Sequence, residues 1–156
     1  MLDQDERDAR KAARAAEREK KREARKAKKE HSILYVDDEM PNLRGFKSTF
    51  KRFFNVYTAE DPIQAMEIVK STPLHIIVSD HRMPEMNGTD LLKEVYDYNP
   101  EIRRMILSGF IKRDELKDAV ESFGIHEFVT KPWDFDDLMA IFKRLLQPDP
   151  PLMVFG

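Results

Sequence analysis

Short apolar runs alternate with amphipathic segments along most of the chain. These runs are rich in apolar residues without strict alternation, and most are followed by polar or charged positions, a pattern typical of strands buried on both faces of a sheet. It predicts strands at residues 33–36, 54–58, 74–78, 102–107 and 125–129. Helices are predicted at residues 41–53, 61–69, 89–98, 112–122 and 134–146, mostly where apolar residues recur every three or four positions.

The alternation of strands and helices predicts the fold. Five strands and five helices joined by short links indicate right-handed βαβ crossovers and a parallel sheet covered on both faces. We therefore expect a flavodoxin-like, doubly wound α/β domain over residues 32–147, with five parallel strands in the order 2-1-3-4-5. In that order the first and third strands are neighbours. A proline-rich tail, residues 148–156, follows the domain.

Residues 1–31 differ in composition from the rest of the chain. Residues 1–30 carry 12 basic and 8 acidic side chains, whereas residues 31–156 carry 15 and 21. Residues 3–30 contain no Gly, Pro or β-branched residue, which predicts a charged helical extension or linker. Because alanines are its only apolar residues, a solvated helix is the simplest interpretation. A coiled coil or partner-binding helix, and a contact of the basic tract 20–29 with nucleic acid or another acidic surface, stay open.

Length and composition exclude several classes of protein. The 156 residues suffice for one globular domain, and the absence of cysteine excludes disulfides, thiolate metal sites and cysteine nucleophiles. No apolar stretch approaches the roughly 18 residues that would span a bilayer. The N-terminus is charged throughout, which is not typical of a secretory signal. We expect a cytoplasmic protein without a membrane partner.

Candidate chemistry stands at the carboxyl ends of the predicted strands, where open parallel sheets bind their ligands. These strand-end residues are three carboxylates, a hydroxyl and an ammonium: Asp37, Asp38, Asp80, Ser108 and Lys131. Three adjacent carboxylates repel one another unless a cation compensates, and an all-oxygen set suits Mg²⁺. A lysine that holds a phosphoryl oxygen would complete a site for phosphoryl transfer to a carboxylate nucleophile. Each residue alone is compatible with a cap or a turn, but their convergence on one edge favours a functional site.

Four motifs carry a resemblance to a known family. They are Val-Asp-Asp-Glu at residues 36–39, Ser-Asp-His-Arg-Met-Pro-Glu-Met-Asn-Gly at 79–88, Leu-Ser-Gly at 107–109 and Val-Thr-Lys-Pro at 129–132. With their spacing, they resemble the CheY-like receiver domain of bacterial two-component response regulators. The match extends over residues 32–147. It implies a phosphoprotein of signal transduction or phosphorelay that catalyses its own phosphorylation and dephosphorylation, not an enzyme acting on a separate substrate.

The resemblance assigns the phosphorylation site. Asp80 is implied to be the phospho-acceptor, and Mg²⁺ is the implied cofactor. Asp80 and Asp38 would ligate the metal directly, Asp37 would act mainly through a water, and the backbone carbonyl of Arg82 would complete the protein ligands. The family usually has alanine at the position of Gly109, so this chain departs from the pattern there.

The resemblance also implies a conformational switch. Ser108 would turn toward the phosphoryl group, with Lys131 as its ion-pair partner and a cis Lys131–Pro132 bond. Phe128 falls at the position of an aromatic switch, the alternative being a plain core residue. The switch would reshape the face formed by residues 112–122, 125–129 and 134–146. We expect Trp133 and Phe135 to place apolar surface near that face, and Arg82 and Phe110 to lie near the path of the hydrolytic water.

The implied partners are a sensor histidine kinase or phosphotransfer protein, and a downstream output domain or partner protein. Homodimerisation stays open. No DNA-binding helix-turn-helix fits into the residues after 147, so we expect no direct DNA binding. Two other functions compete. One is a phosphorylation-independent, receiver-like scaffold or dimerisation module, which would predict loss of Asp80 or Lys131. The other is a haloacid-dehalogenase-type hydrolase, but such enzymes carry Asp-x-Asp, with the nucleophile, after the first strand. In this chain no Asp-x-Asp follows the first predicted strand.

Overall fold

The computed structural model describes residues 1–155, with the side chains of all of these except residues 23–28. In this part of the chain six helices alternate with five strands. Their bounds are α1 (Gln4–Lys28), β1 (Ser32–Val36), α2 (Met40–Phe50), β2 (Asn55–Ala59), α3 (Pro62–Ser71), β3 (Ile76–Ser79), α4 (Gly88–Tyr98), β4 (Arg103–Ser108), α5 (Arg113–Ser122), β5 (Glu127–Thr130) and α6 (Phe135–Leu145).

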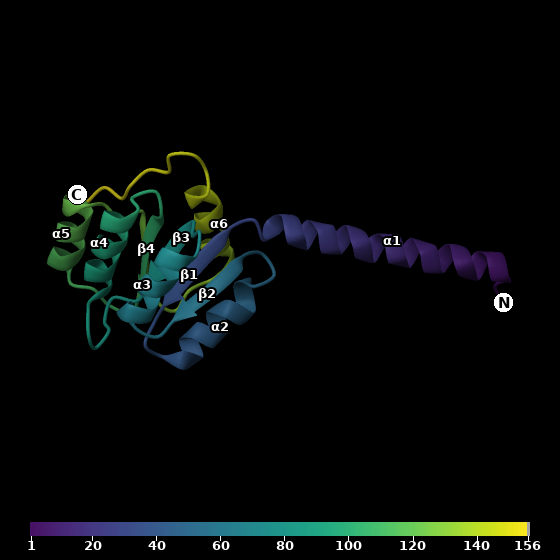
Figure 1. Ribbon diagram of the computed structural model, residues 1–156, viewed down its shortest axis with the longest axis horizontal. Coiled ribbons are helices and arrows are strands. Elements are labelled where there is room, and N and C mark those ends of the chain that lie inside the picture. Colours follow the sequence, from purple (N-terminus) through teal and green to yellow (C-terminus); the bar gives the residue numbers. More distant parts are fainter. Residues whose placement is uncertain (156) are drawn as a thin grey trace.

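The five strands form one parallel sheet in the order β2-β1-β3-β4-β5, as predicted (Figure 1). Val36 at the end of β1 is paired with Ala59 of β2 on one side and with Ser79 of β3 on the other. The ends of β1 and β3 therefore lie side by side. The residues that follow these two strands are brought to the same edge of the sheet.

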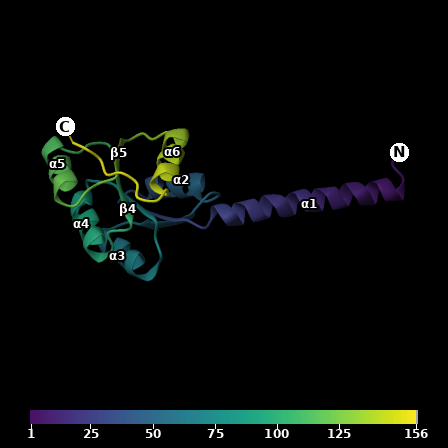
Figure 2. The same cartoon turned by 90° about the horizontal axis from the view of Figure 1, so that it is seen from above.

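Two apolar layers hold the helices against the sheet. Successive residues of a strand point to opposite faces, so Leu34 and Val36 of β1 pack with α3, α4 and α5, whereas Ile33 and Tyr35 pack with α2 and α6. All five residues of β1 and all four of β3 are buried. Figure 2 shows α2 and α6 on one side of the sheet and α3, α4 and α5 on the other. The doubly wound architecture follows from strands that are apolar on both faces.

One predicted helix is longer than the one observed. The prediction of a helix over residues 41–53 is wrong at its C-terminal end, because α2 ends at Phe50. The amides of Phe53 and Phe54 both donate to the carbonyl of Phe50, which closes a turn before β2 begins at Asn55. Several other predicted boundaries differ by one or two residues, and each predicted strand and helix is present.

Helix α1 projects away from the domain, as a solvated helix would (Figures 1 and 2). Residues 3–22 are all exposed. At the start of α1, the Asp3 carboxylate accepts a hydrogen bond from the Glu6 amide while the Glu6 carboxylate accepts one from the Asp3 amide, which is a reciprocal capping box. Within residues 1–155, no helix combines the length and apolarity needed to cross a membrane.

Candidate functional site

The sheet brings the five strand-end residues to one edge. Asp37 and Asp38 follow β1, Asp80 follows β3, Ser108 ends β4 and Lys131 follows β5. The backbone holds them in register, because the Asp80 amide donates to the Val36 carbonyl at 2.8 Å and the Lys131 amide donates to the Ser108 carbonyl at 2.9 Å. The Lys131–Pro132 peptide bond is cis, as expected.

Lys131 forms ion pairs with two of the carboxylates. Its Nζ lies 2.7 Å from Asp37 Oδ2 and 3.2 Å from Asp80 Oδ2. Burial of Lys131 opposes its charge, but its hydrogen bond to Asp37 and the charges of Asp37 and Asp80 outweigh this effect and raise the pKa of the ammonium. Lys131 therefore stays protonated where the ends of β1, β3 and β5 meet.

Asp37 is fully buried and has several hydrogen-bond donors. Its Oδ2 accepts from the Tyr35 hydroxyl at 2.6 Å and from Asn42 Nδ2 at 3.1 Å, besides Lys131, and its Oδ1 accepts from the Glu39 amide at 2.9 Å. Burial alone would raise the pKa of this carboxyl, but the hydrogen bonds from Lys131, Tyr35 and the Glu39 amide, with the charge of Lys131, lower it below its ordinary value. Burial, together with the hydrogen bond to Asp37, raises the pKa of Tyr35. Asp37 is thus held as a carboxylate inside the fold.

Asp80 is held from both sides of its strand and is 9% exposed. Its Oδ1 accepts from Ser108 Oγ and from the His81 amide, both at 2.7 Å. Gly88, at the start of α4, lies directly against the Asp80 backbone, and a Cβ at this position would be 2.2 Å from the Asp80 carbonyl oxygen. The acceptor carboxylate predicted from the sequence is therefore fixed in a tight loop, with the Ser108 hydroxyl already in contact with it.

The acidic side chains suit a hard cation. Asp37, Asp38 and Asp80 each place one carboxylate oxygen within 4.8 Å of the other two. Asp38 is exposed and makes no side-chain hydrogen bond or ion pair within the described part of the chain. A Mg²⁺ ion takes oxygen ligands and keeps several waters, so this set of donors fits it. Arg82, whose carbonyl the resemblance adds to the ligands, lies in the loop after Asp80, and its guanidinium stacks over the Phe110 ring at 5.0 Å.

The aromatic residues of the predicted switch occupy two different places. Phe128 is partly buried in β5 and packs against the apolar layer under α3, α4 and α5. Trp133 and Phe135 pack on Phe50 of α2, with ring centroids at 5.4 and 5.6 Å. The expectation that these two rings lie near the face of α5, β5 and α6 is therefore wrong, because the large apolar side chains of α2 offer them a site at the other side of α6.

Three contributors to the site were not predicted from the sequence. Tyr35 lies two positions before Asp37 on a strand, so both side chains point to the same face, a spacing that could have indicated their contact. Asn42 lies in the first turn of α2 and reaches back to Asp37. Gly88 was recognised as part of a motif, but its close approach to Asp80 depends on the path of the loop.

The comparisons with known proteins agree on one family. A family model described as the response regulator receiver domain matches residues 33–143. The hydrogenase transcriptional regulatory protein HoxA of Cupriavidus necator is 30% identical over 119 residues, which cover 76% of this chain and 25% of HoxA. A solved structure of an uncharacterized protein from Neptuniibacter caesariensis has a TM-score of 0.70 at 35% identity, covering 76% of this chain and 88% of that one.

A more distant structure supports the fold alone. The signal receiver domain of an HD domain-containing protein from Pseudomonas fluorescens Pf-5 has a TM-score of 0.71 at 24% identity, covering 74% of this chain and 94% of that one. The chain spans about a quarter of the length of the two HoxA proteins that it matches. Since the family model covers more than two thirds of the sequence, the chain belongs to the response regulator receiver domain family, a class of signalling modules.

Proposed function

We propose that this domain accepts a phosphoryl group on Asp80 in a Mg²⁺-dependent reaction and signals through a change of its surface. The observation that carries the proposal is the arrangement around Asp80. One of its carboxylate oxygens accepts a hydrogen bond from Ser108 at 2.7 Å, and the other faces the Lys131 ammonium at 3.2 Å. A carboxylate in this setting can act as the nucleophile that accepts a phosphoryl group. The neighbouring hydroxyl and cation can then bind the oxygens of the phosphoryl group.

The metal would be held by Asp38 and Asp80 directly, by Asp37 mainly through a water, and by the carbonyl of Arg82. The support for this set is that the three carboxylates lie within reach of one ion. When bound, Mg²⁺ neutralises part of the charge on a phosphoryl group. Lys131 neutralises another part, and its ion pair with Asp37 keeps the ammonium at the site before a phosphoryl group arrives.

The transfer forms one bond and breaks one. A carboxylate oxygen of Asp80 attacks phosphorus in line, and an O–P bond forms while the bond from phosphorus to the donor atom breaks. The electron pair of that bond stays with the leaving group, which is the imidazole nitrogen of a phosphohistidine or the acetate oxygen of acetyl phosphate. Lys131 then pairs with a phosphoryl oxygen, and the Ser108 hydroxyl donates to another.

The signal would travel through the sheet edge to a surface. Ser108, drawn toward the phosphoryl group, changes the space beside Phe128, which is partly buried two residues before the end of β5. The signalling face comprises α5, β5 and α6. Phosphorylation acts by favouring one of two arrangements of this face, which is a shift of populations rather than a new fold.

The partners belong to the same proposal. The donor would be a sensor histidine kinase or a phosphotransfer protein; one relative of this chain, 29% identical over 119 residues, is the sensor kinase CckA of Brucella abortus. The output would be another domain or a partner protein, since the matched receiver forms only part of relatives such as HoxA. We place the receiver at residues 32–147, the charged extension that could connect it to other parts at 1–31, and a proline-rich tail at 148–156.

Intact-protein mass tests the proposal. The full chain is incubated with acetyl phosphate and Mg²⁺, and in parallel with acetyl phosphate and a chelator. We expect a gain of one phosphoryl group that requires Mg²⁺ and that is absent in Asp80→Asn. The matched control is Asp90→Asn, an exposed carboxylate of α4, which should gain as much as the wild type. If neither the wild type nor the control gains mass, the phosphorylation-independent scaffold is the better account.

A further inference from the structure

The segment after α6 folds back over the domain. Pro148 cannot continue the helix, and Asp149 adopts a left-handed conformation with φ of 49°, which turns the chain. Two further prolines, Pro150 and Pro151, keep the backbone extended. Figures 1 and 2 both show the tail running from the end of α6 across to α5, where the described chain ends.

Residues 152–155 dock beside α5 and the loop between α5 and β5. The Leu152 side chain lies against Gly124, where a Cβ would be 2.8 Å from a Leu152 methyl carbon. The Met153 amide donates to the Ile125 carbonyl at 2.8 Å, and the Met153 side chain packs against the apolar layer under α3, α4 and α5. Val154 points away and is 92% exposed. The tail is therefore anchored by two apolar side chains and one backbone hydrogen bond on residues 124–125, the loop that leads from α5 into β5.

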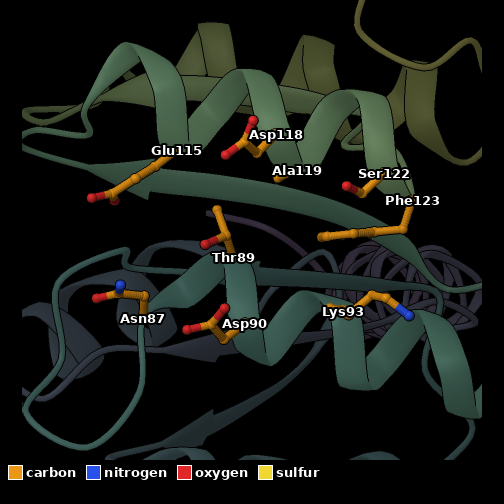
Figure 3. Close-up of a pocket in the computed structure, with 9 residues that line it drawn as sticks. All are labelled: Asn87, Thr89, Asp90, Lys93, Glu115, Asp118, Ala119, Ser122 and Phe123. Atoms are coloured by element: carbon orange, nitrogen blue, oxygen red, sulfur yellow. The ribbon is translucent and has the colours of Figure 1, made fainter.

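The tail also contacts the first residue of α5. The Arg113 guanidinium lies 4.6 Å from the centre of the Phe155 ring, a cation–π arrangement. On the other side of the same helical turn, Glu115 pairs with the imidazole of His81, whose side chain is 2% exposed and follows Asp80 in sequence. Figure 3 shows Glu115 extending from the start of α5 along the cleft of about 340 Å³ between α4 and α5. The first turn of α5 is thus held by the phosphorylation loop on one side and by the tail on the other.

We propose that residues 152–155 are a tethered cap on the α5–β5 part of the signalling face, and that phosphorylation of Asp80 releases it. The release rests on the proposed function, because it needs the movement of α5 relative to β5. The tail bridges the loop before β5 and the start of α5, with Met153 on Ile125 and Phe155 on Arg113. If the N-terminus of α5 shifts relative to β5, the tail cannot keep both contacts. The docked tail therefore favours one position of α5 and the acyl phosphate favours the other.

Because residues 152–155 are covalently linked to α6, weak contacts are enough to keep them docked. A segment attached a few residues away acts at an effective concentration on the order of millimolar, so it covers its site without a large interface. A partner protein or a second copy of the domain that uses the same surface must compete with the tail. Release by phosphorylation therefore frees the Ile125 carbonyl and the Arg113 side chain at the same time. This couples the chemical event at Asp80 to access at α5 and the loop before β5.

The experiment measures the tail in the full chain by NMR. The readouts are the hydrogen-exchange rate of the Met153 amide and the chemical shift of the Met153 methyl group, with and without acetyl phosphate and Mg²⁺. The variants are Phe155→Ala, which removes the ring on Arg113, and the matched control Val154→Ala, which alters a side chain that contacts little. Intact mass is recorded on each sample to show whether a phosphoryl group is present.

Before phosphorylation, we expect the Met153 amide to exchange at least tenfold more slowly than the same residue in a peptide of residues 148–156. Phe155→Ala should remove most of this protection, and Val154→Ala should keep it. After a mass gain of one phosphoryl group, protection in the wild type should fall to less than twofold. An unprotected amide in the unmodified wild type overturns the cap. Equal protection with and without the phosphoryl group overturns the release. Absence of any mass gain overturns the proposed function and, with it, the release. In that case the exchange rates of the unmodified chain still test whether the tail covers its site.

Discussion

No side chain fits between Gly88 and the backbone of Asp80. A Cβ at position 88 would lie 2.2 Å from the Asp80 carbonyl oxygen and 2.9 Å from the Cα of His81. The Gly88 amide donates to the His81 carbonyl at 2.7 Å, so the start of α4 is tied to the residue after Asp80. This contact closes the loop of residues 81–87 against the end of β3.

Gly88→Ala should therefore destabilise the domain by about 1–3 kcal/mol, the usual cost of forcing extra volume into a packed site. The check is urea unfolding of the variant beside Gly45→Ala, whose new methyl group meets nothing within 4 Å and lies inside α2. That control should be more stable than the wild type by up to about 1 kcal/mol, because Ala is the better helix former. Equal stabilities for Gly88→Ala and the wild type would contradict the tight loop.

Tyr35→Phe should raise the pKa of Asp37 and lower stability at neutral pH. The hydroxyl donates at 2.6 Å to a carboxylate whose pKa is lowered in the fold, and a hydrogen bond to a charged group contributes about 1.5–3 kcal/mol. A lowered pKa of Asp37 stabilises the fold at pH values above the pKa that Asp37 has in the unfolded chain, and this stabilisation is lost when Asp37 is protonated. The difference in unfolding free energy between the variant and the wild type should therefore shrink in acid. Carboxyl NMR titration and unfolding at several pH values measure both effects. An unchanged Asp37 titration would exclude this role of Tyr35.

Phe110→Ala should shorten the lifetime of the acyl phosphate several-fold. Phe110 is 55% exposed, and its ring centroid lies 5.0 Å from the guanidinium of Arg82, two residues after Asp80. We expect this pair to limit the approach of water to the acyl phosphate. The measurement is the decay of the phosphorylated mass after removal of acetyl phosphate. Phe135→Ala is the control, because that ring is also exposed but packs on Phe50. A lifetime that changes equally in both variants would show that the effect is not local.

Lowering the pH should destabilise the domain through His126. Its Nδ1 accepts from the Arg104 amide at 3.0 Å, and burial, with the nearby cations of Arg104 and Arg103, lowers its pKa to about 4. The unfolded chain binds a proton near pH 6.5 and the folded chain only near 4, so stability falls as the pH decreases between these values, by up to about 3 kcal/mol.

The contribution of His126 is isolated by His126→Asn, whose amide oxygen accepts the same hydrogen bond without titrating in this range. As the pH falls from 7 toward 4.5, the unfolding free energy of the wild type should decrease by up to about 3 kcal/mol relative to that of the variant. Parallel pH dependences would show that other groups cause the acid sensitivity.

The sheet and the gathering of polar side chains at its edge were predictable from the sequence, because several strands are apolar runs that a polar side chain ends or follows. Asp37 directly after β1 and Asp80 directly after β3 are examples. Because the strands are parallel, their carboxyl ends meet at the same edge of the sheet. The lengths of elements were less predictable: the end of α2 depends on a turn formed by the amides of Phe53 and Phe54 on one carbonyl.

The surroundings of the site depend on tertiary packing that no local pattern encodes. Trp133 packs toward α2 because Phe50 is there, not because of its own neighbours in sequence. The donors that surround Asp37 come from a strand, a helix and the loop after β5. The return of the tail to α5 depends on the left-handed conformation of Asp149, which composition does not predict.

The most direct test of the central claim is to locate the phosphoryl group. The chain is phosphorylated with acetyl phosphate and Mg²⁺ and then treated with borohydride, which reduces the acyl phosphate of an aspartate to homoserine. Peptide mass spectrometry then identifies the converted residue. The account predicts conversion at position 80 alone and none in Asp80→Asn. Conversion at Asp37 or Asp38, or undiminished labelling of the Asp80→Asn chain, would contradict it.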